Sequence, residues 1–277
     1  MALSTFCLVA LGMAVSSYAT LIGAGGGFIL MPLLLLLFPH DNPHELTAIS
    51  LSCMLIYTFS TTAAYAKLKM VDFKSGLFFG AAALPGAVLG VVASGAVSRE
   101  FFELLFAVFL IGLALFAAHT SRRESAPRKI SLPSSRRGWN VRKTATAYGI
   151  VFEYDCNRLL AIPLFFALGF MTCCMGIGGS ALMIPAFIYI LNFPIFIATG
   201  TARFIAAILT FTATATHLGM GSFGHAALLR VVAIGIGMII GARMGARFSV
   251  RIRRVWTFRS LAVVLALVGI RMVLAVL

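Results

Sequence analysis

The chain has 277 residues, of which 61% are hydrophobic and only 11% are charged. Soluble domains carry charge on about a quarter of their residues, so this composition excludes a water-soluble fold. The charges are unequal, with 22 Lys and Arg against 8 Asp and Glu and a formal net charge of +14. That excess would indicate a nucleic-acid partner in a soluble protein, but in so apolar a chain its relation to a membrane must be considered first.

Ten helical segments are expected from the apolar runs and the residues that interrupt them. The uncharged run over residues 1–40 is expected to be mature structure, because it lacks the basic N-terminal region of a signal peptide. Several runs exceed the ~20 apolar residues that span a bilayer. In chain order the segments are 2–22, 28–38, 44–66, 74–95, 101–119, 159–175, 180–191, 194–219, 225–247 and 256–276.

Two of these segments, 28–38 and 180–191, are too short to cross a membrane alone. Each follows a glycine cluster at the end of an apolar helix: GAGGG over residues 23–27 and GIGGS over residues 176–180. The sequence therefore predicts two broken or re-entrant helix pairs.

The two clusters belong to an internal repeat. The stretch IGAGGGFILMP (22–32) aligns with MGIGGSALMIP (175–185), and a G-x-x-x-G pair recurs at Gly86 and Gly90 and at Gly237 and Gly241. We therefore expect an all-α polytopic membrane protein of two repeats, at 1–119 and 159–277. A basic linker and interfacial segment, 120–158, separates them, and its part 148–158 is expected to be a helix or a loop.

The basic residues indicate orientation. Most of them lie in the links 67–74 and 247–254 and in the polar stretch 120–147. The positive-inside rule places these three segments in the cytoplasm and both termini outside, so that the repeats are inverted. The net charge is then a topology signal, and no nucleic-acid partner is needed to explain it.

The glycine clusters are the first candidate site. Non-helical backbone at membrane depth must be buried in protein or line a watery cavity. A helix that begins there presents backbone N–H groups and a positive dipole end, which bind anions. Close helix packing is the alternative role of such glycines. The expected substrate-binding positions in the two clusters are Gly25, Gly26, Gly27, Gly178, Gly179 and Ser180.

Arg203 is the second candidate, because it stands alone between the uncharged runs 159–202 and 204–229. A guanidinium at that depth is costly without a partner or a wet cavity, and its planar fork suits an oxyanion. Thr201, and Ser50 in the first repeat, are expected to orient the anion. Snorkelling or pairing with a buried carboxylate is the alternative for Arg203. Snorkelling is the preferred account for Arg230.

Three cysteines, Cys53, Cys173 and Cys174, fall near the expected cavity. Buried cysteine usually behaves as a small hydrophobic residue, and a contact to a sulfur-containing substrate is the alternative. His217 is near a helix end, where it is either a surface residue or a residue that relays protons. Metalloprotease, nucleotide-binding and hydrolase motifs are absent from the sequence. We therefore expect no enzyme activity and no cofactor.

The two G-x-G-G-G/S stretches, each followed by an apolar helix and a proline (Gly23 to Pro32, Gly176 to Pro185), resemble the TauE/SafE family of sulfite and organosulfonate exporters. The resemblance covers nearly the whole chain. It implies a multi-pass inner-membrane secondary transporter of small sulfur-containing anions. The stretch Gly200-Thr201-Ala202-Arg203 departs from the family pattern, in which a small hydroxyl residue commonly follows the threonine.

The expected function is export of such an oxyanion by alternating access, with the lipid bilayer and the anion as partners. A coupling proton or ion and the oligomeric state are left open. The alternatives are uptake of thiosulfate or a related compound through a cysteine-assisted path, and a membrane scaffold or sensor that transports nothing.

Overall fold

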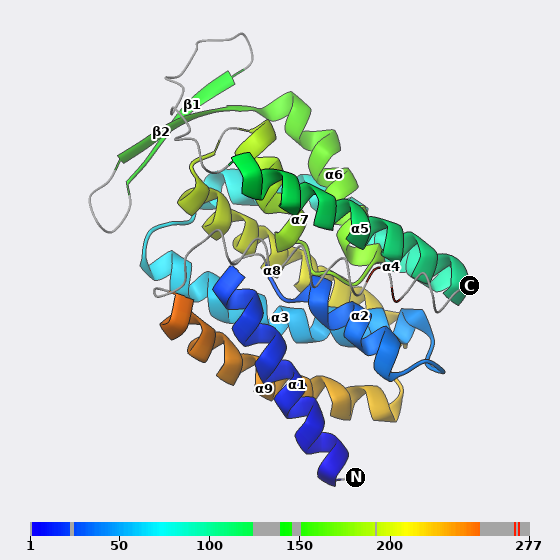
Figure 1. Cartoon of the computed structure of the whole chain (residues 1–277). Helices are drawn as coiled ribbons and strands as arrows, with labels where there is room; N and C mark the ends of the chain where they lie inside the picture. Colours follow the sequence, from blue (N-terminus) through cyan, green and yellow to red (C-terminus); the bar gives the residue numbers. More distant parts are fainter. Residues whose placement is uncertain are drawn as a thin grey trace.

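The computed structural model describes residues 2–22, 25–123, 139–145, 151–191, 193–249, 269 and 271. The last expected segment, 256–276, lies outside these residues apart from 269 and 271. The other segments form helices close to the expected bounds (Figure 1). They are α1 (Ala2–Ile22), α2 (Gly27–Leu37), α3 (Pro43–Lys67), α4 (Phe73–Ala96), α5 (Arg99–Arg123), α6 (Arg158–Cys174), α7 (Ser180–Pro185), α8 (Ile195–Gly219) and α9 (His225–Ser249).

The helix lengths confirm the all-α polytopic class. Helices α3, α4 and α8 and the Ala226–Gly245 part of α9 are each long and apolar enough to cross a membrane. The two segments expected to be short are short: α2 has 11 residues, and α7 has six before it continues as a five-residue π-helix, η1 (Ala186–Ile190). A glycine break precedes α2 and another precedes α7.

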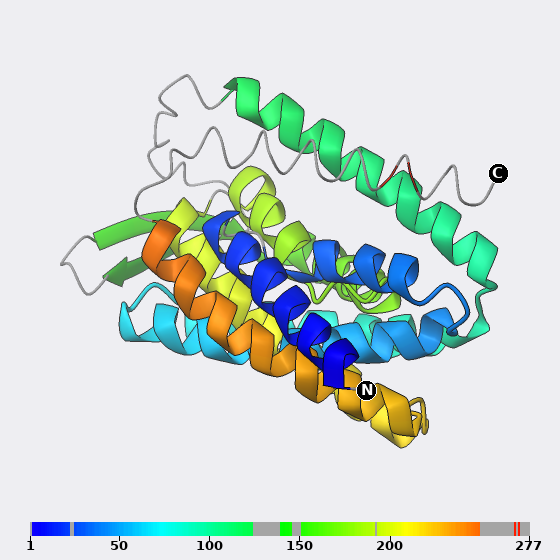
Figure 2. The same ribbon diagram turned by 60° about the horizontal axis from the view of Figure 1, so that its bottom comes forward.

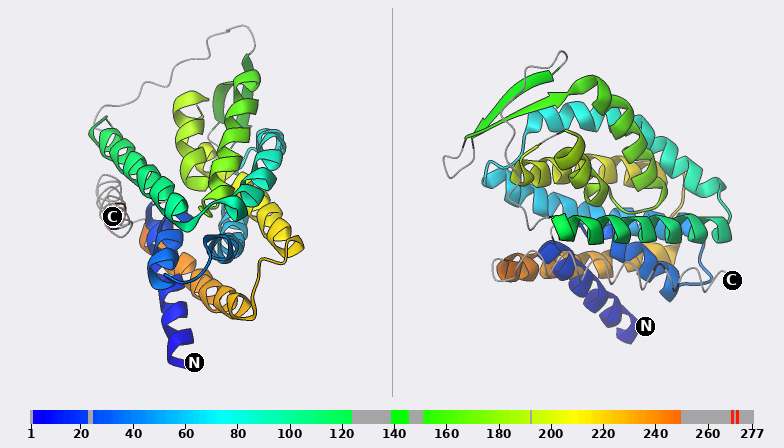
Figure 3. Two further views of the ribbon diagram at one scale, coloured as in Figure 1. Left: turned by 90° about the vertical axis from the view of Figure 1, so that its right-hand side faces the viewer. Right: turned by 45° about the horizontal axis from the view of Figure 1, so that its top comes forward.

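A two-stranded hairpin interrupts the helical pattern. Strand β1 (Trp139–Ala145) pairs antiparallel with β2 (Val151–Asn157), with Trp139 opposite Asn157 and Ala145 opposite Val151. The expectation of a helix or a loop over 148–158 is therefore wrong for 151–157. The stretch VFEYDCN alternates apolar and polar residues at period two, which favours a strand. The hairpin lies outside the helical bundle (Figures 1 and 3).

Three pairs of helices pack across the two halves of the chain: α1 on α9, α4 on α6, and α3 on α8. Glycines allow the backbones to approach. A Cβ added to Gly237 or Gly241 of α9 would overlap backbone carbonyls of α1, and one added to Gly86 or Gly90 of α4 would overlap those of α6. An internal repeat would produce such packing of each half on the other. The inversion of the repeats stays a prediction.

The basic links gather at one end of the bundle. The link after α3, the hairpin and the C-terminal ends of α5 and α9 lie together at the left in Figures 1 and 2. The links 38–42, 97–98 and 220–224 lie at the opposite end. We call these the basic end and the acidic-link end. Which of them faces the cytoplasm stays a prediction from the positive-inside rule.

Candidate functional site

The two glycine breaks lie against each other in the interior. Gly25 has a φ of 92°, and Gly178 and Gly179 have φ of 76° and 88°, conformations that side chains rarely adopt. A Cβ on Gly25 would overlap the hydroxyl of Ser180, and a Cβ on Gly27 would overlap the carbonyl of Ile177. The sequence positions that we expected to bind substrate in the two repeats are thus brought together.

Helices α3 and α8 form the walls around the breaks. An added Cβ on Gly178 would lie within 3.0 Å of the Met54 side chain in α3, and one on Gly179 would lie 3.6 Å from Ala206 in α8. Thr58 of α3 and Thr210 of α8 approach within 3.2 Å through their hydroxyl oxygens. All of these residues are buried, and so are the described residues of the two breaks that they enclose.

Hydrogen bonds fix the breaks from within. The Ser50 hydroxyl of α3 donates to the carbonyl oxygen of Gly176 at 2.6 Å. The backbone N–H of Ser180 donates to the carbonyl of Gly178 at 3.2 Å. Ser50 therefore holds the second break in place, and the N–H of Ser180 is engaged inside it. At the first break, Gly26 accepts the backbone N–H bonds of Ile29 and Leu30 and so begins α2.

Arg203 is buried one helical turn from the second break. Its side chain is on α8, three residues or about 4.5 Å along the axis from Ala206, and the residue is only 2% exposed. Its Cζ atom lies 4.8 Å from the ring centroid of Tyr65 and 6.0 Å from that of Tyr57. Cation–π attraction to the two rings stabilises the guanidinium at this depth.

Thr201 and Asp72 close this region toward the basic end. The Thr201 hydroxyl accepts the backbone N–H of Asp72 at 3.0 Å, and the Asp72 carboxylate caps α4 by accepting from the N–H groups of Lys74 and Ser75. Thr201 thus fastens α8 to the link before α4, and its expected role in orienting the anion stays a prediction. Sequence reasoning missed Asp72, Tyr57 and Tyr65. Only the position of Asp72 directly before a helix was a readable signal.

The three cysteines are buried, and two of them lie at described helix contacts. The Cys53 thiol points at the backbone carbonyl of Val231 in α9, with 3.8 Å between sulfur and oxygen. Cys174 lies where Gly90 of α4 approaches α6. These surroundings are those of a small hydrophobic residue.

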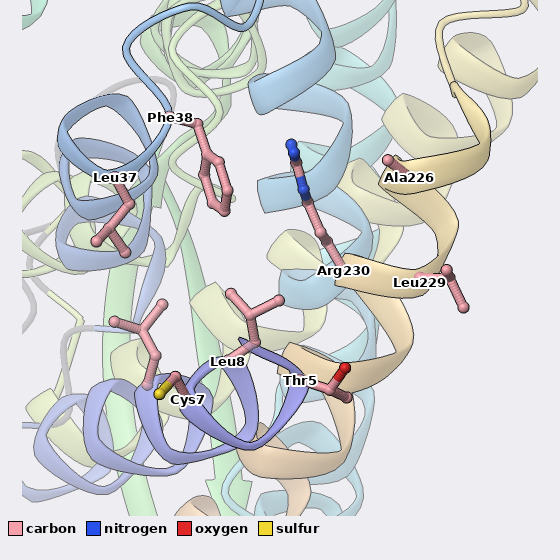
Figure 4. A pocket seen from close by; sticks show the side chains of 9 residues that line it. Thr5, Cys7, Leu8, Leu37, Phe38, Ala226, Leu229 and Arg230 are labelled. Carbon is pink, nitrogen blue, oxygen red and sulfur yellow. The ribbon is translucent and has the colours of Figure 1, made fainter. Parts of the chain in front are cut away.

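A separate cavity of about 640 Å³ opens between α1, the end of α2 and the start of α9 (Figure 4). Its walls are mostly apolar, and its one charged lining residue is Arg230. The Arg230 guanidinium pairs with the carboxylate of Asp41 and lies 3.9 Å from the ring centroid of Phe38. A carboxylate from the α2–α3 link thus reaches Arg230, and the expectation that its side chain snorkels stays a prediction.

Comparison with known proteins places the chain in one family. The family described as "Sulfite exporter TauE/SafE" matches residues 8–272. The chain belongs to this family. It is also 28% identical over 277 residues to the probable membrane transporter protein YunE of Bacillus subtilis (strain 168), and the alignment covers 98% of each chain. No solved structure gives a significant match. Together these findings identify a multi-pass membrane transporter of the TauE/SafE family.

Proposed function

We propose that this TauE/SafE-family protein is a secondary transporter in the cytoplasmic membrane that exports a small sulfur-containing oxyanion, such as sulfite or an organosulfonate, by alternating access. The observation that carries the proposal is the contact between the two glycine breaks in the protein interior, with Arg203 one turn away on α8. Transporters with broken helices bind substrate where such breaks meet.

The chemistry of the breaks suits an oxyanion. Glycine at both breaks lets the backbone approach a ligand closely, and the start of α2 adds the positive end of a helix dipole. Arg203 supplies a full charge and a planar fork of N–H donors. The anion would be held by the backbone of Gly25, Gly26 and Gly27, by that of Gly178 and Gly179, by the Ser180 hydroxyl and by Arg203.

Binding and transport are tested separately. Purified protein in detergent is heated with sulfite, sulfate, thiosulfate, taurine or sulfoacetate, since a bound ligand raises the unfolding temperature by mass action. Counterflow of labelled sulfite into proteoliposomes then measures transport. Stabilisation by sulfite or a sulfonate together with counterflow supports the proposal. A protein that shows no counterflow with any of these anions would instead be a scaffold or sensor.

Arg203 variants test the site itself. Arg203→Lys keeps a positive charge but loses the planar fork, and Arg203→Ala loses both. Hydrogen bonds to charged groups contribute about 1.5–3 kcal/mol, so we expect Arg203→Ala to weaken anion binding by at least about tenfold. Arg243→Ala, at an exposed position of α9, is the matched control. Unchanged affinity and rate in Arg203→Ala would remove the arginine from the site. Unchanged affinity and rate in Gly179→Leu would show that the glycine breaks are not part of the anion site.

Cysteine-assisted uptake is the competing transport function. Replacing Cys53, Cys173 and Cys174 together with serine should leave sulfite counterflow intact if the breaks and Arg203 form the site. Loss of thiosulfate transport with retention of the fold would favour the cysteine path instead.

A further inference from the structure

A partly buried polar chain at the acidic-link end takes no part in the proposed anion site. It joins four elements: His44 at the start of α3, Ser94 near the end of α4, His217 in the last turn of α8, and Ser222 in the link 220–224. His44 Nδ1 lies 2.9 Å from Ser94 Oγ, and His44 Nε2 lies 2.8 Å from Ser222 Oγ. His217 Nδ1 lies 3.2 Å from the same Ser222 oxygen, and the two ring centroids are 4.7 Å apart.

The direction of the first bond in the chain follows from Ser94. The Ser94 hydroxyl donates its one proton to the backbone carbonyl of Val91 at 2.7 Å. Its oxygen can therefore only accept from His44, which makes Nδ1 of His44 the protonated nitrogen. In a neutral imidazole the other nitrogen, Nε2, is then an acceptor.

The remaining directions follow in turn. Because Nε2 of His44 accepts, the Ser222 hydroxyl must donate to it, which uses the only proton of that hydroxyl. The Ser222 oxygen must then accept from Nδ1–H of His217. This leaves Nε2 of His217 as a bare acceptor. His217 is fully buried, and within the described part of the chain this nitrogen has no hydrogen-bond partner.

Several charged groups lie at the same end of the bundle, and most are engaged with one another. Asp41 pairs with Arg230, and Arg99 pairs with Glu103 at 2.6 Å. Glu45, next to His44 on α3, points its carboxylate at the link 220–224, where an added Cβ on Gly224 would lie 3.2 Å from its Oε1. His225 follows that glycine in the sequence, and His40 is exposed on the α2–α3 link.

One turn of α3 connects the chain to the second glycine break. The Thr47 hydroxyl donates to the backbone carbonyl of His44 at 2.7 Å. Thr47 in turn lies against Gly176, whose added Cβ would come within 3.2 Å of the Thr47 Cα. One packed residue, Thr47, therefore separates His44 from the backbone of the break.

We propose that His44, Ser222 and His217 form a proton-binding site that couples proton movement to anion transport. This inference rests on the proposed transport function. A proton from water adds to Nε2 of His217, the proton on His217 Nδ1 passes to the Ser222 oxygen, and the Ser222 hydroxyl proton passes to Nε2 of His44. The pair gains one proton, and no other bond is made or broken. The charge can reside on α8 or on α3, the two helices that wall the glycine breaks.

The protonation pattern is tested without any substrate. In protein labelled with ¹⁵N-histidine and purified in detergent, NMR distinguishes the two neutral tautomers of each ring. The hydrogen-bond chain requires the Nδ1–H tautomer for both His44 and His217 at roughly pH 8. His44→Asn and His217→Asn identify the two sets of signals by their loss. An Nε2–H tautomer on either ring would overturn the chain of donors and acceptors.

Coupling is tested with wild-type protein and two variants in proteoliposomes. His217→Asn places an amide nitrogen near the position of Nδ1, which keeps the bond to Ser222 but cannot take up a proton. The exposed His40→Asn is the matched control. We expect a pH gradient to drive net uptake of labelled sulfite with wild type and His40→Asn, and this response to fall by at least about tenfold in His217→Asn. Counterflow without a gradient should stay within about twofold of wild type in all three.

The outcomes separate the two proposals. Protonation of sulfite itself is common to all preparations, and protein-free liposomes give the background, so a difference between variants belongs to the protein. A gradient response that survives in His217→Asn would overturn the coupling. Ser222→Ala, which removes the bridge and keeps both rings, should lose the response as well and serves if His217→Asn does not fold. Absence of counterflow in the wild type would refute the transport function. The NMR measurement of the tautomers would still test the hydrogen-bond chain, because it needs no transport.

Discussion

Gly27→Ala should destabilise the protein through a single methyl group. Gly27 begins α2, and an added Cβ would overlap the carbonyl of Ile177 and lie only 2.9 Å from its Cα. Carbon atoms pack best at about 3.5–4.0 Å, so the two breaks would have to separate by on the order of 1 Å. Overpacking of this kind costs about 1–3 kcal/mol. The φ of Gly27 is not positive, so the cost is one of space alone.

Gly112→Ala is the matched control with the opposite sign. Gly112 lies in the middle of α5, and an added Cβ meets nothing within 4 Å. Alanine in a helix interior is favoured over glycine by about 0.5–1 kcal/mol. The unfolding temperature in detergent should therefore fall by about 2 °C or more for Gly27→Ala and rise slightly for Gly112→Ala. Sulfite counterflow should fall only in the first variant. A Gly27→Ala protein with wild-type stability and transport would refute the close contact of the breaks.

Two further variants test the surroundings of the site. Thr201→Val keeps the shape of the side chain but leaves the buried backbone N–H of Asp72 without its acceptor, so the free energy of unfolding should fall by about 1–3 kcal/mol; faster hydrogen exchange at the Asp72 amide is the specific measurement, and unchanged exchange would contradict the bond. Asp41→Asn removes the charge that faces Arg230 at a partly exposed position, so the free energy of unfolding should fall by less than about 1 kcal/mol. Because salt screens the pair, the loss should be larger at low salt than at high salt. A loss above this limit would mean that the pair anchors the α2–α3 link.

Much of the helical architecture was predictable, because hydrocarbon thickness sets the length of a spanning helix and glycine runs mark where one breaks. The bounds of α2 and of the α7–η1 segment follow from the clusters before Phe28 and Ala181. The hairpin was missed because the polar composition of the linker masked the alternation in residues 151–157. A strand of seven residues leaves only a weak signal in such a stretch.

The surroundings of the candidate site were not predictable, because they depend on contacts between residues far apart in the sequence. Nothing near Arg203 in sequence indicates that Tyr57 and Tyr65 lie beside it. His44 and His217 are likewise brought together only by the packing of α3 on α8. Sequence patterns locate residues along a helix, whereas the partner across an interface is set by helix packing.

The reciprocal packing of the helices also limits how the protein can move. Gly237 brings the backbone of α9 against α1, and Gly86 does the same for α4 against α6. Each of these tight pairs takes one helix from the first half of the chain and one from the second. If residues 1–119 rocked as one body against residues 159–277, both backbone contacts would have to open at once. The mobile bodies in a transport cycle are therefore expected to be the mixed pairs, α1 with α9 and α4 with α6, and the boundary between them does not follow the order of the chain.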